Sequence, residues 1–189
     1  MKTLFQSLLY IGLLTTSVLA QAGTKIAGVE LADQYQLGGE SLALNGAGVR
    51  SKFFFRIYVG ALYTGKTSNN AVELVAATGP ASMQMIMLYK KVEAEKITSG
   101  WREGFRANVT DAEFKQLEER LQQFNDLFPD LRAGDIVHMD FMPNRGTTLS
   151  INGKVLGTIQ GEDFFGALLK VWIGDHPADG RLKAGLLGR

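Results

Sequence analysis

The apolar positions of this chain fall into stretches with the two-residue period of strands and stretches with the spacing of helices. The longest strand-like stretch occupies residues 44–63. Its aromatic, β-branched and other bulky side chains suit a pleated, half-buried surface. They are Phe53, Phe54, Phe55, Ile57, Tyr58, Val59, Leu62 and Tyr63. The pattern predicts one or two long strands at residues 50–63, preceded by short strands at residues 26–31 and 42–44.

Another strand is predicted after Gly79-Pro80, a pair of residues that interrupts regular secondary structure. Two sets of side chains alternate there, with Met83, Met85, Met87 and Tyr89 in one set and Gln84, Ile86 and Leu88 in the other. This alternation has the period of a strand. Because both sets are mostly apolar, we expect both faces of this strand to be largely buried.

Helical spacing follows in residues 93–108, where apolar side chains recur every four positions with charges between them. These apolar residues are Ile97, Trp101 and Phe105. Thr110 and Glu113 have the spacing of a capping box and predict the start of a second helix, whose apolar stripe ends near Pro129. Further helices are predicted at residues 69–77, 163–172 and 179–187.

Three more strands are predicted at residues 135–142, 146–151 and 154–160. Asn152-Gly153 joins the last two and is a strong signal for a type I′ hairpin turn. The order of strands, helices, strands and helices predicts an α+β fold, in which an antiparallel sheet is covered on one face by helices. A ligand would lie between these two layers.

Residues 1–22 have the pattern of a signal peptide, with a single Lys2, an apolar core at residues 8–14 and small residues at Val18 and Ala20. We expect cleavage after Ala20 or Ala22, export to the periplasm, and no transmembrane anchor after processing. The alternative is a retained anchor, but the apolar core is shorter than the roughly 20 residues of a spanning helix. Residues 23–189 would then form one domain.

The composition of the chain limits the classes of function that it can have. With 189 residues, of which 46% are hydrophobic, the chain is large enough for one well-buried core. It has no cysteine, so neither a disulfide nor thiolate chemistry is available. Removing Lys2 with the signal peptide lowers the 20 basic residues to 19, which balances the 19 acidic residues. This balance gives no indication of nucleic-acid binding.

The most informative polar residue is Arg50, which follows Gly46 and Gly48 at the start of the long apolar stretch. The glycines allow a turn or a bulge, and they deliver a fixed positive charge next to apolar surface. A guanidinium in such a place suits a planar anion. The alternative is an arginine paired with a carboxylate at the sheet edge.

Other candidate chemistry is sparse. His138 and His176 lie in separate elements without the ligand spacing of a metal site, and no Ser/His/Asp triad or phosphate-binding glycine loop is present. We therefore predict no cofactor and no metal. Met83, Met85 and Met87 suit a cleft for a flexible acyl chain, although methionine also serves as a filler of core volume.

Three segments resemble the chalcone isomerase family. The first is GAG-x-R at residues 46–50, followed by G-x-x-Y at residues 60–63. The second is EKITSGWREGF at residues 95–105, and the third is FFGALLKVWIGDHPADGRLKAGLLG at residues 164–188. The resemblance is greatest to the bacterial, exported, chalcone isomerase-like branch, and it implies that family's open-faced sandwich of sheet and helices.

The resemblance does not extend to the whole active site of the plant enzymes. It matches their arginine with Arg50, but it places Tyr58 at their threonine, and Glu93 and Gly100 at their catalytic tyrosine and asparagine. A glutamate would add negative charge to a pocket meant for a phenolate, which argues against chalcone cyclisation. Non-catalytic family members that bind fatty acids hold the carboxylate with an arginine and a tyrosine, matched here by Arg50 and Tyr58.

The leading hypothesis is therefore an exported, non-catalytic protein that holds a fatty acid, or a similar amphipathic or aromatic carboxylate, in an apolar cleft. Its ligand-binding residues would be Arg50, Tyr58, Met83, Met85 and Met87. One alternative is an isomerase or lyase in which Arg50, Tyr58 and Glu93 act on a small substrate. Another is a periplasmic scaffold or assembly protein that binds a protein partner.

Overall fold

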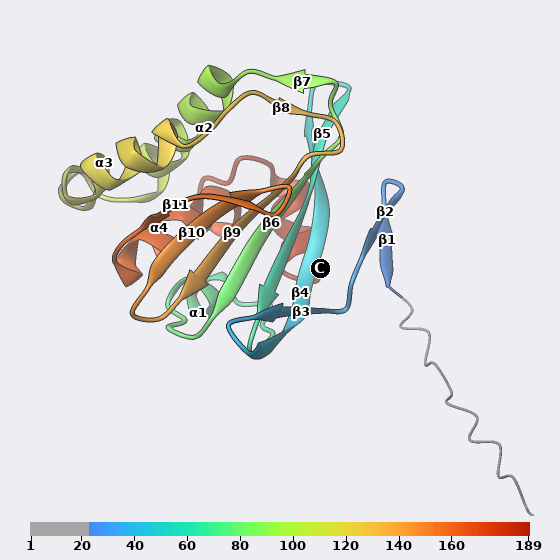
Figure 1. The fold of residues 1–189 in the computed structure, drawn as a ribbon, viewed down its shortest axis with the longest axis horizontal. Helices are drawn as coiled ribbons and strands as arrows, with labels where there is room; N and C mark the ends of the chain where they lie inside the picture. The colour runs from blue at the N-terminus through green and yellow to red at the C-terminus, as the bar shows by residue number, and fades with distance from the viewer. Residues whose placement is uncertain (1–22) are drawn as a thin grey trace, which may run out of the picture.

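The predicted strands assemble into one seven-stranded antiparallel sheet in the computed structural model, which describes residues 23–189 (Figure 1). The strand order is β11-β10-β9-β6-β5-β4-β3. These strands are β3 (Gln34–Leu37), β4 (Glu40–Lys52), β5 (Phe55–Thr64), β6 (Ala81–Met87), β9 (Ile136–Met142), β10 (Gly146–Ile151) and β11 (Lys154–Ile159). The turn at Asn152-Gly153 joins β10 and β11, and both turn residues have positive φ, as a type I′ turn requires. This hairpin is confirmed.

Within residues 23–189, five helices accompany the sheet. They are α1 (Ala71–Val75), α2 (Ala94–Asn108), α3 (Asp111–Asp126), α4 (Glu162–Ile173) and α5 (Gly180–Leu186). The capping box predicted for α3 is present, because the Thr110 N–H donates to Glu113 Oε2 at 2.8 Å and the Glu113 N–H donates to Thr110 Oγ1 at 3.2 Å. In Figure 1, α4 lies behind the sheet and α2 and α3 lie at its upper left. No helix of residues 23–189 is long and apolar enough to cross a membrane.

The main core lies between the helices and one face of the sheet. From the sheet it takes alternate side chains such as Tyr58, Leu62 and Met85, and from α4 it takes Phe164 and Trp172. The opposite face, which we call the rear face, carries a second core of Leu31, Leu42, Val59, Ala61 and Tyr63. The α+β fold with helices on one face is therefore confirmed, and so is the burial of both faces of β6.

The rear face is covered in part because the sheet curls. Three strands separate β3 from β9 in the sheet order, yet the Tyr35 hydroxyl on β3 lies 3.0 Å from both His138 Nδ1 and Asp140 Oδ2 on β9. The N-terminal strands pack against the same face. The sequence pattern predicted one strand at residues 26–31, but a turn at Ala27 and Gly28 splits it into β1 (Thr24–Ile26) and β2 (Val29–Leu31).

The prediction of half-buried aromatic residues at positions 53–55 is wrong. A two-residue turn, Phe53-Phe54, joins β4 to β5, and the side chains of Phe53, Phe54 and Phe55 are 87%, 99% and 55% exposed. Phenylalanine has a high propensity for strands, but this propensity does not determine whether its side chain is covered by other residues. Likewise, the short strand predicted at residues 42–44 is only a part of the thirteen-residue β4.

The glycines before Arg50 have a physical reason in helix packing. Gly46 and Gly48 face α5, where a Cβ on Gly46 would collide with the Gly185 carbonyl oxygen and one on Gly48 would lie 3.3 Å from Leu182 Cα. Strand and helix backbones thus approach closely only because side chains are absent. The predicted bulge is also present, since the β4–β5 register shifts between Leu44 and Gly46.

Candidate functional site

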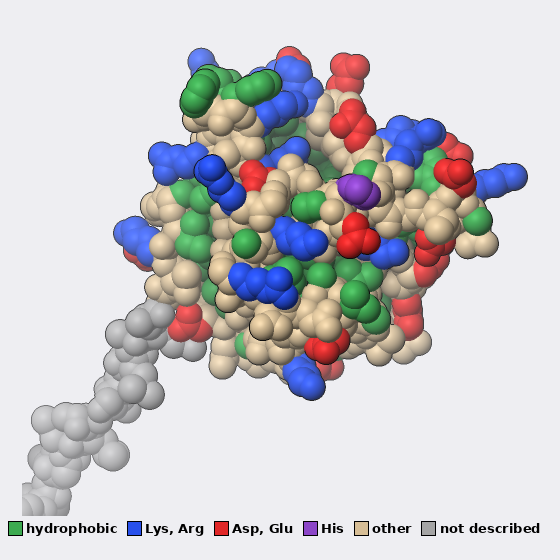
Figure 2. Space-filling view, turned by 180° about the vertical axis from the view of Figure 1, so that it is seen from behind, with side chains coloured by type: hydrophobic (Ala, Val, Ile, Leu, Met, Phe, Trp, Pro, Cys, Tyr) green, Lys and Arg blue, Asp and Glu red, His purple; other side chains and the backbone are tan. Residues whose placement is uncertain are grey.

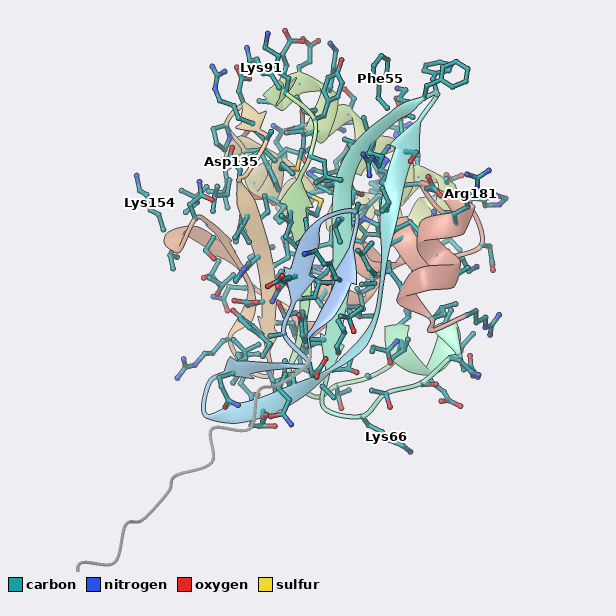
Figure 3. The ribbon with its side chains drawn as sticks, turned by 90° about the vertical axis from the view of Figure 1, so that its right-hand side faces the viewer. Phe55, Lys66, Lys91, Asp135, Lys154 and Arg181 are labelled. Atoms are coloured by element: carbon teal, nitrogen blue, oxygen red, sulfur yellow. The ribbon has the colours of Figure 1, made fainter. Side chains whose placement is uncertain are left out.

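A cleft of about 470 Å³ lies between the end of the sheet that carries the β4–β5 turn and helix α2. Its sheet wall includes Arg50, Ile57, Tyr58, Met85 and Met87, and its helix wall includes Ile97, Gly100 and Trp101. The two-stranded sheet of β7 (Lys91–Val92) and β8 (Leu131–Arg132) borders it as well. Figure 3 shows the labelled Phe55 and Lys91 at this same end of the molecule.

The positive charge of Arg50 has no carboxylate partner. Arg50 lies opposite Tyr58 in the β4–β5 register, with its Cζ 5.7 Å from the centroid of the Tyr58 ring. Within residues 23–189, no salt bridge of 4.0 Å or less involves Arg50. Arg50 thus forms no salt bridge at the sheet edge, although its charge is near enough to Asp179 to lower the pKa of that carboxyl, and its guanidinium is available to an anion in the cleft.

The nearby carboxylate of Asp179 is used elsewhere. Asp179 Oδ1 accepts hydrogen bonds from the N–H groups of Arg181 and Leu182 at the start of α5, and its Oδ2 accepts one from the Ser51 N–H at 3.0 Å. Partial burial raises the pKa of Asp179, but these backbone donors and the charge of Arg50 outweigh burial and lower it. Asp179 thus anchors α5 beside Arg50.

Tyr58 is buried in the cleft wall with one free hydrogen-bonding function. Its hydroxyl oxygen accepts a hydrogen bond from Trp172 Nε1 at 2.8 Å. Burial raises the pKa of Tyr58, and the charge of Arg50 opposes this shift, so the phenol stays protonated near neutral pH. No residue of the described chain accepts the hydroxyl proton. Tyr58 can therefore donate to an oxygen atom of a ligand.

Trp101 is a site residue that the sequence interpretation treated only as part of an apolar stripe. Its side chain lines the cleft and packs edge-on against Trp172, with ring centroids 5.2 Å apart. Its indole N–H is buried and has no hydrogen-bond acceptor among residues 23–189. A buried donor without an acceptor is uncommon and costly, so the indole of Trp101 is an unsatisfied polar group in the wall of the cleft.

The three methionines divide between cleft and core. Met85 and Met87 line the cleft, as predicted. Met83 is fully buried but lies farther along β6, where its Cε fills the space above Gly60 next to Leu182. It is not part of the cleft wall. The apolar wall is completed instead by Val171 of α4 and by other side chains around α2.

The charge of the cleft is mainly positive. Its lining includes Arg50, Lys52, Lys91 and Lys96, against Glu103 as the only acidic side chain of the lining. Lys91 and Lys96 are paired with Asp130 and Glu93 outside the lining, so Arg50 and Lys52 carry the unpaired positive charge. Such a lining favours an anionic ligand over a cationic one. No group of three or more histidine, aspartate or glutamate side chains in residues 23–189 is arranged to hold a metal ion.

Comparisons with known proteins identify the family of this fold. Residues 23–188 match the family model described as chalcone isomerase-like. The chain belongs to the chalcone isomerase-like family. Among solved structures, it is similar to a fatty-acid binding protein of Arabidopsis thaliana, with a TM-score of 0.63 and 15% sequence identity over 82% of this chain and 95% of the other. At that identity the likeness shows the fold alone. No curated protein matches the chain in sequence.

Within the chalcone isomerase-like fold, the two positions aligned with the catalytic residues of the plant enzymes differ in their placement. Gly100 lines the cleft, and nothing lies within 4 Å of the point that its Cβ would occupy. Glu93 precedes α2 outside the cleft lining, with 54% of its side chain exposed and its Oε2 3.0 Å from Lys96 Nζ. The hydrogen bond and charge of Lys96 lower the pKa of Glu93. The structure thus brings Arg50 and Tyr58 together and leaves Glu93 apart.

Proposed function

We propose that this protein binds a fatty acid, or a similar amphipathic or aromatic carboxylate, in the cleft between the sheet and α2. The observation that carries the proposal is the pairing of an Arg50 guanidinium without a carboxylate partner and a Tyr58 hydroxyl without an acceptor for its proton. A carboxylate has two oxygen atoms and could accept from both groups at once.

The rest of the cleft suits the apolar part of such a ligand. A volume of about 470 Å³ is within the range of roughly 300–1,000 Å³ that is usual for small-molecule sites. Met85 and Met87 provide unbranched side chains that adapt to a flexible chain. The family relationship and the fold shared with a fatty-acid binding protein support this reading.

A binding role is favoured over an isomerase or lyase role by the position of Glu93. A proton-transfer group must reach the reacting atoms directly or through one water molecule. Glu93 is exposed, paired with Lys96 and outside the cleft lining. Tyr58 remains as a polar partner of Arg50, but its pKa is raised, which makes it a donor rather than a base near neutral pH.

The experiment that tests this proposal is native mass spectrometry of the protein purified without delipidation, followed by organic extraction of whatever it carries. We expect a carboxylate-containing lipid at a ratio of about one to one, released on denaturation. The delipidated protein should then bind added palmitate. A protein that arrives empty and binds neither palmitate nor an aromatic carboxylate would contradict the proposal and leave the scaffold alternative.

We also propose that the protein acts after export to the periplasm. The proposal rests on the sequence pattern of residues 1–22, which lie outside the described residues. Cell fractionation and N-terminal sequencing of the protein test it, with Gln21 or Gly23 expected as the first residue. Recovery from the cytoplasm with Met1 at the N-terminus would contradict it.

A further inference from the structure

The β4–β5 turn exposes an unusual amount of apolar surface at one point of the molecule. Phe53 and Phe54 are the two most exposed large hydrophobic residues in the described chain, and Phe55 follows them directly. The Phe55 ring packs against Tyr89, with centroids 5.4 Å apart, which widens the apolar surface. Single exposed apolar side chains are ordinary, but a contiguous cluster indicates an interaction site. We call Phe53, Phe54 and Phe55 the aromatic tip.

The backbone of the turn gives no reason for aromatic residues there. Of the two central residues, only Phe53 has a positive φ, at 55°. This is the pattern of a type II′ turn, which favours glycine at its first central position. A phenylalanine at that position strains the backbone and exposes its ring. The aromatic residues at the tip therefore do not help the turn to form. We infer that they contact something outside the chain.

The charged side chains that flank the aromatic tip most closely in the chain are positive. Residues 51–57 contain Lys52 and Arg56 and no acidic residue. Lys52 and Arg56 are exposed and have no salt-bridge partner within residues 23–189. Figure 2 shows hydrophobic side chains protruding at the top of the molecule with Lys or Arg side chains beside them. Exposed aromatic rings within a group of cations complement an anionic lipid surface.

The shape of the tip distinguishes a membrane from a protein as its partner. A two-residue turn is a narrow projection, and its rings are almost completely surrounded by solvent. A protein would need a matching pocket to bury them, whereas the boundary between head groups and acyl chains admits such rings without a preformed shape.

We propose that the aromatic tip docks on an anionic phospholipid membrane and brings the mouth of the cleft to the lipid surface. The cleft lining includes Phe53 and Phe55 of the aromatic tip and the adjacent Lys52, so docking places the cleft next to the bilayer. The docking step is independent of any ligand. Its use in passing an amphipathic carboxylate between membrane and cleft rests on the proposed function.

Co-sedimentation with vesicles tests the docking step without a fatty acid. The delipidated protein should pellet with vesicles of phosphatidylcholine and phosphatidylglycerol, pellet less as salt rises, and stay in solution with phosphatidylcholine alone. Phe54→Ser and Arg56→Glu change residues outside the cleft lining, and each should weaken vesicle binding by about tenfold. Val72→Ser and Arg145→Glu are matched exposed controls elsewhere on the surface and should bind as wild type does.

Three variants keep the docking proposal separate from ligand binding and from the stability of the turn. Phe54→Ser should bind palmitate in vesicle-free buffer as tightly as wild type, while Arg50→Ala should lose palmitate but still pellet with anionic vesicles. Phe53→Gly should raise the melting temperature, because it relieves the turn, and still weaken vesicle binding.

The docking proposal is overturned if the wild-type protein ignores anionic vesicles or if Phe54→Ser pellets as well as wild type. It is also overturned if the protein is a dimer in solution that Phe54→Ser dissociates, because the tip would then bind a second copy of the chain.

Discussion

Both faces of the central sheet carry a tyrosine among polar side chains, but the two tyrosines differ in their partners. On the rear face, the Tyr35 hydroxyl contacts both Asp140 and His138, and Asp140 also accepts a hydrogen bond from Ser82 at 2.6 Å. On the helix-covered face, the proton of the Tyr58 hydroxyl has no acceptor in the described chain.

The same difference extends to the neighbours of each tyrosine. Gln84 Nε2 on the rear face donates to Ser82 Oγ at 3.3 Å, which completes a closed network. Around Tyr58, the Arg50 guanidinium has no salt bridge and the Trp101 indole N–H has no acceptor. A polar network that satisfies itself stabilises the fold, whereas one that lacks acceptors is ready for a ligand that supplies them.

The largest expected effect is on the cleft. Arg50→Ala should lower palmitate affinity roughly ten- to a hundredfold, because a charge-assisted hydrogen bond contributes about 1.5–3 kcal/mol. It should change the melting temperature little, since the guanidinium has no carboxylate partner to lose. Isothermal titration of the delipidated protein measures the affinity. Arg145→Ala removes an exposed arginine outside the cleft lining and serves as the control.

The opposite behaviour is expected on the rear face. Asp140→Ala removes the acceptor of Ser82 and Tyr35 and should lower the free energy of unfolding by about 2 kcal/mol, as measured by urea denaturation. Palmitate affinity should stay at the wild-type value. Asp175→Ala removes an exposed carboxylate and should leave both quantities unchanged. If Asp140→Ala instead loses palmitate binding with its stability intact, the two faces do not differ as described.

A matched pair of tyrosine variants sharpens the contrast. Tyr58→Phe should lower palmitate affinity by about tenfold, because one hydrogen bond to the carboxylate is lost. Tyr63→Phe removes a rear-face hydroxyl that donates to the Ala32 carbonyl oxygen at 2.9 Å. It should cost about 1 kcal/mol of unfolding free energy without changing affinity. Equal affinities of the two variants would remove Tyr58 from the site.

The smallest expected effect is a pH dependence of stability from the rear face. Burial lowers the pKa of His138, and the charge of Asp140 opposes burial without cancelling it. An unfolded histidine titrates near pH 6.5. As the pH falls below that value, the unfolded state therefore takes up the proton more readily than the folded state, and stability is lost. Between pH 7.5 and 5.5, the melting temperature of wild type should fall more than that of His138→Gln.

The parts of the fold that the sequence predicted well are governed by local rules. The capping box at Thr110 and the Asn152-Gly153 turn depend on residues within a few positions of one another, and both were predicted correctly. The β4–β5 turn has no glycine, asparagine, aspartate or proline to mark it, so Phe53 and Phe54 were assigned to a strand. The short strand β3 was missed although Gly38-Gly39 after it is a hairpin signal.

The candidate site was predicted in part. The family resemblance indicated both Arg50 and Tyr58, and the structure places them opposite each other in the β4–β5 register. The unpartnered indole of Trp101 could not be predicted, because its burial and the absence of an acceptor depend on how α2 and α4 meet. The alternation of side chains in β6 indicates which of them share a face of the sheet, but it does not indicate where along the strand the cleft ends. Met83 was therefore predicted to line the cleft together with Met85 and Met87.

The central claim is that Arg50 selects the negative charge of a carboxylate in the cleft. The most direct test compares the affinities of palmitate and its uncharged methyl ester for wild type and for Arg50→Ala. We predict that wild type prefers palmitate by roughly tenfold or more and that Arg50→Ala binds the two ligands equally. A wild-type protein without this preference, or an Arg50→Ala variant that keeps it, would contradict the account.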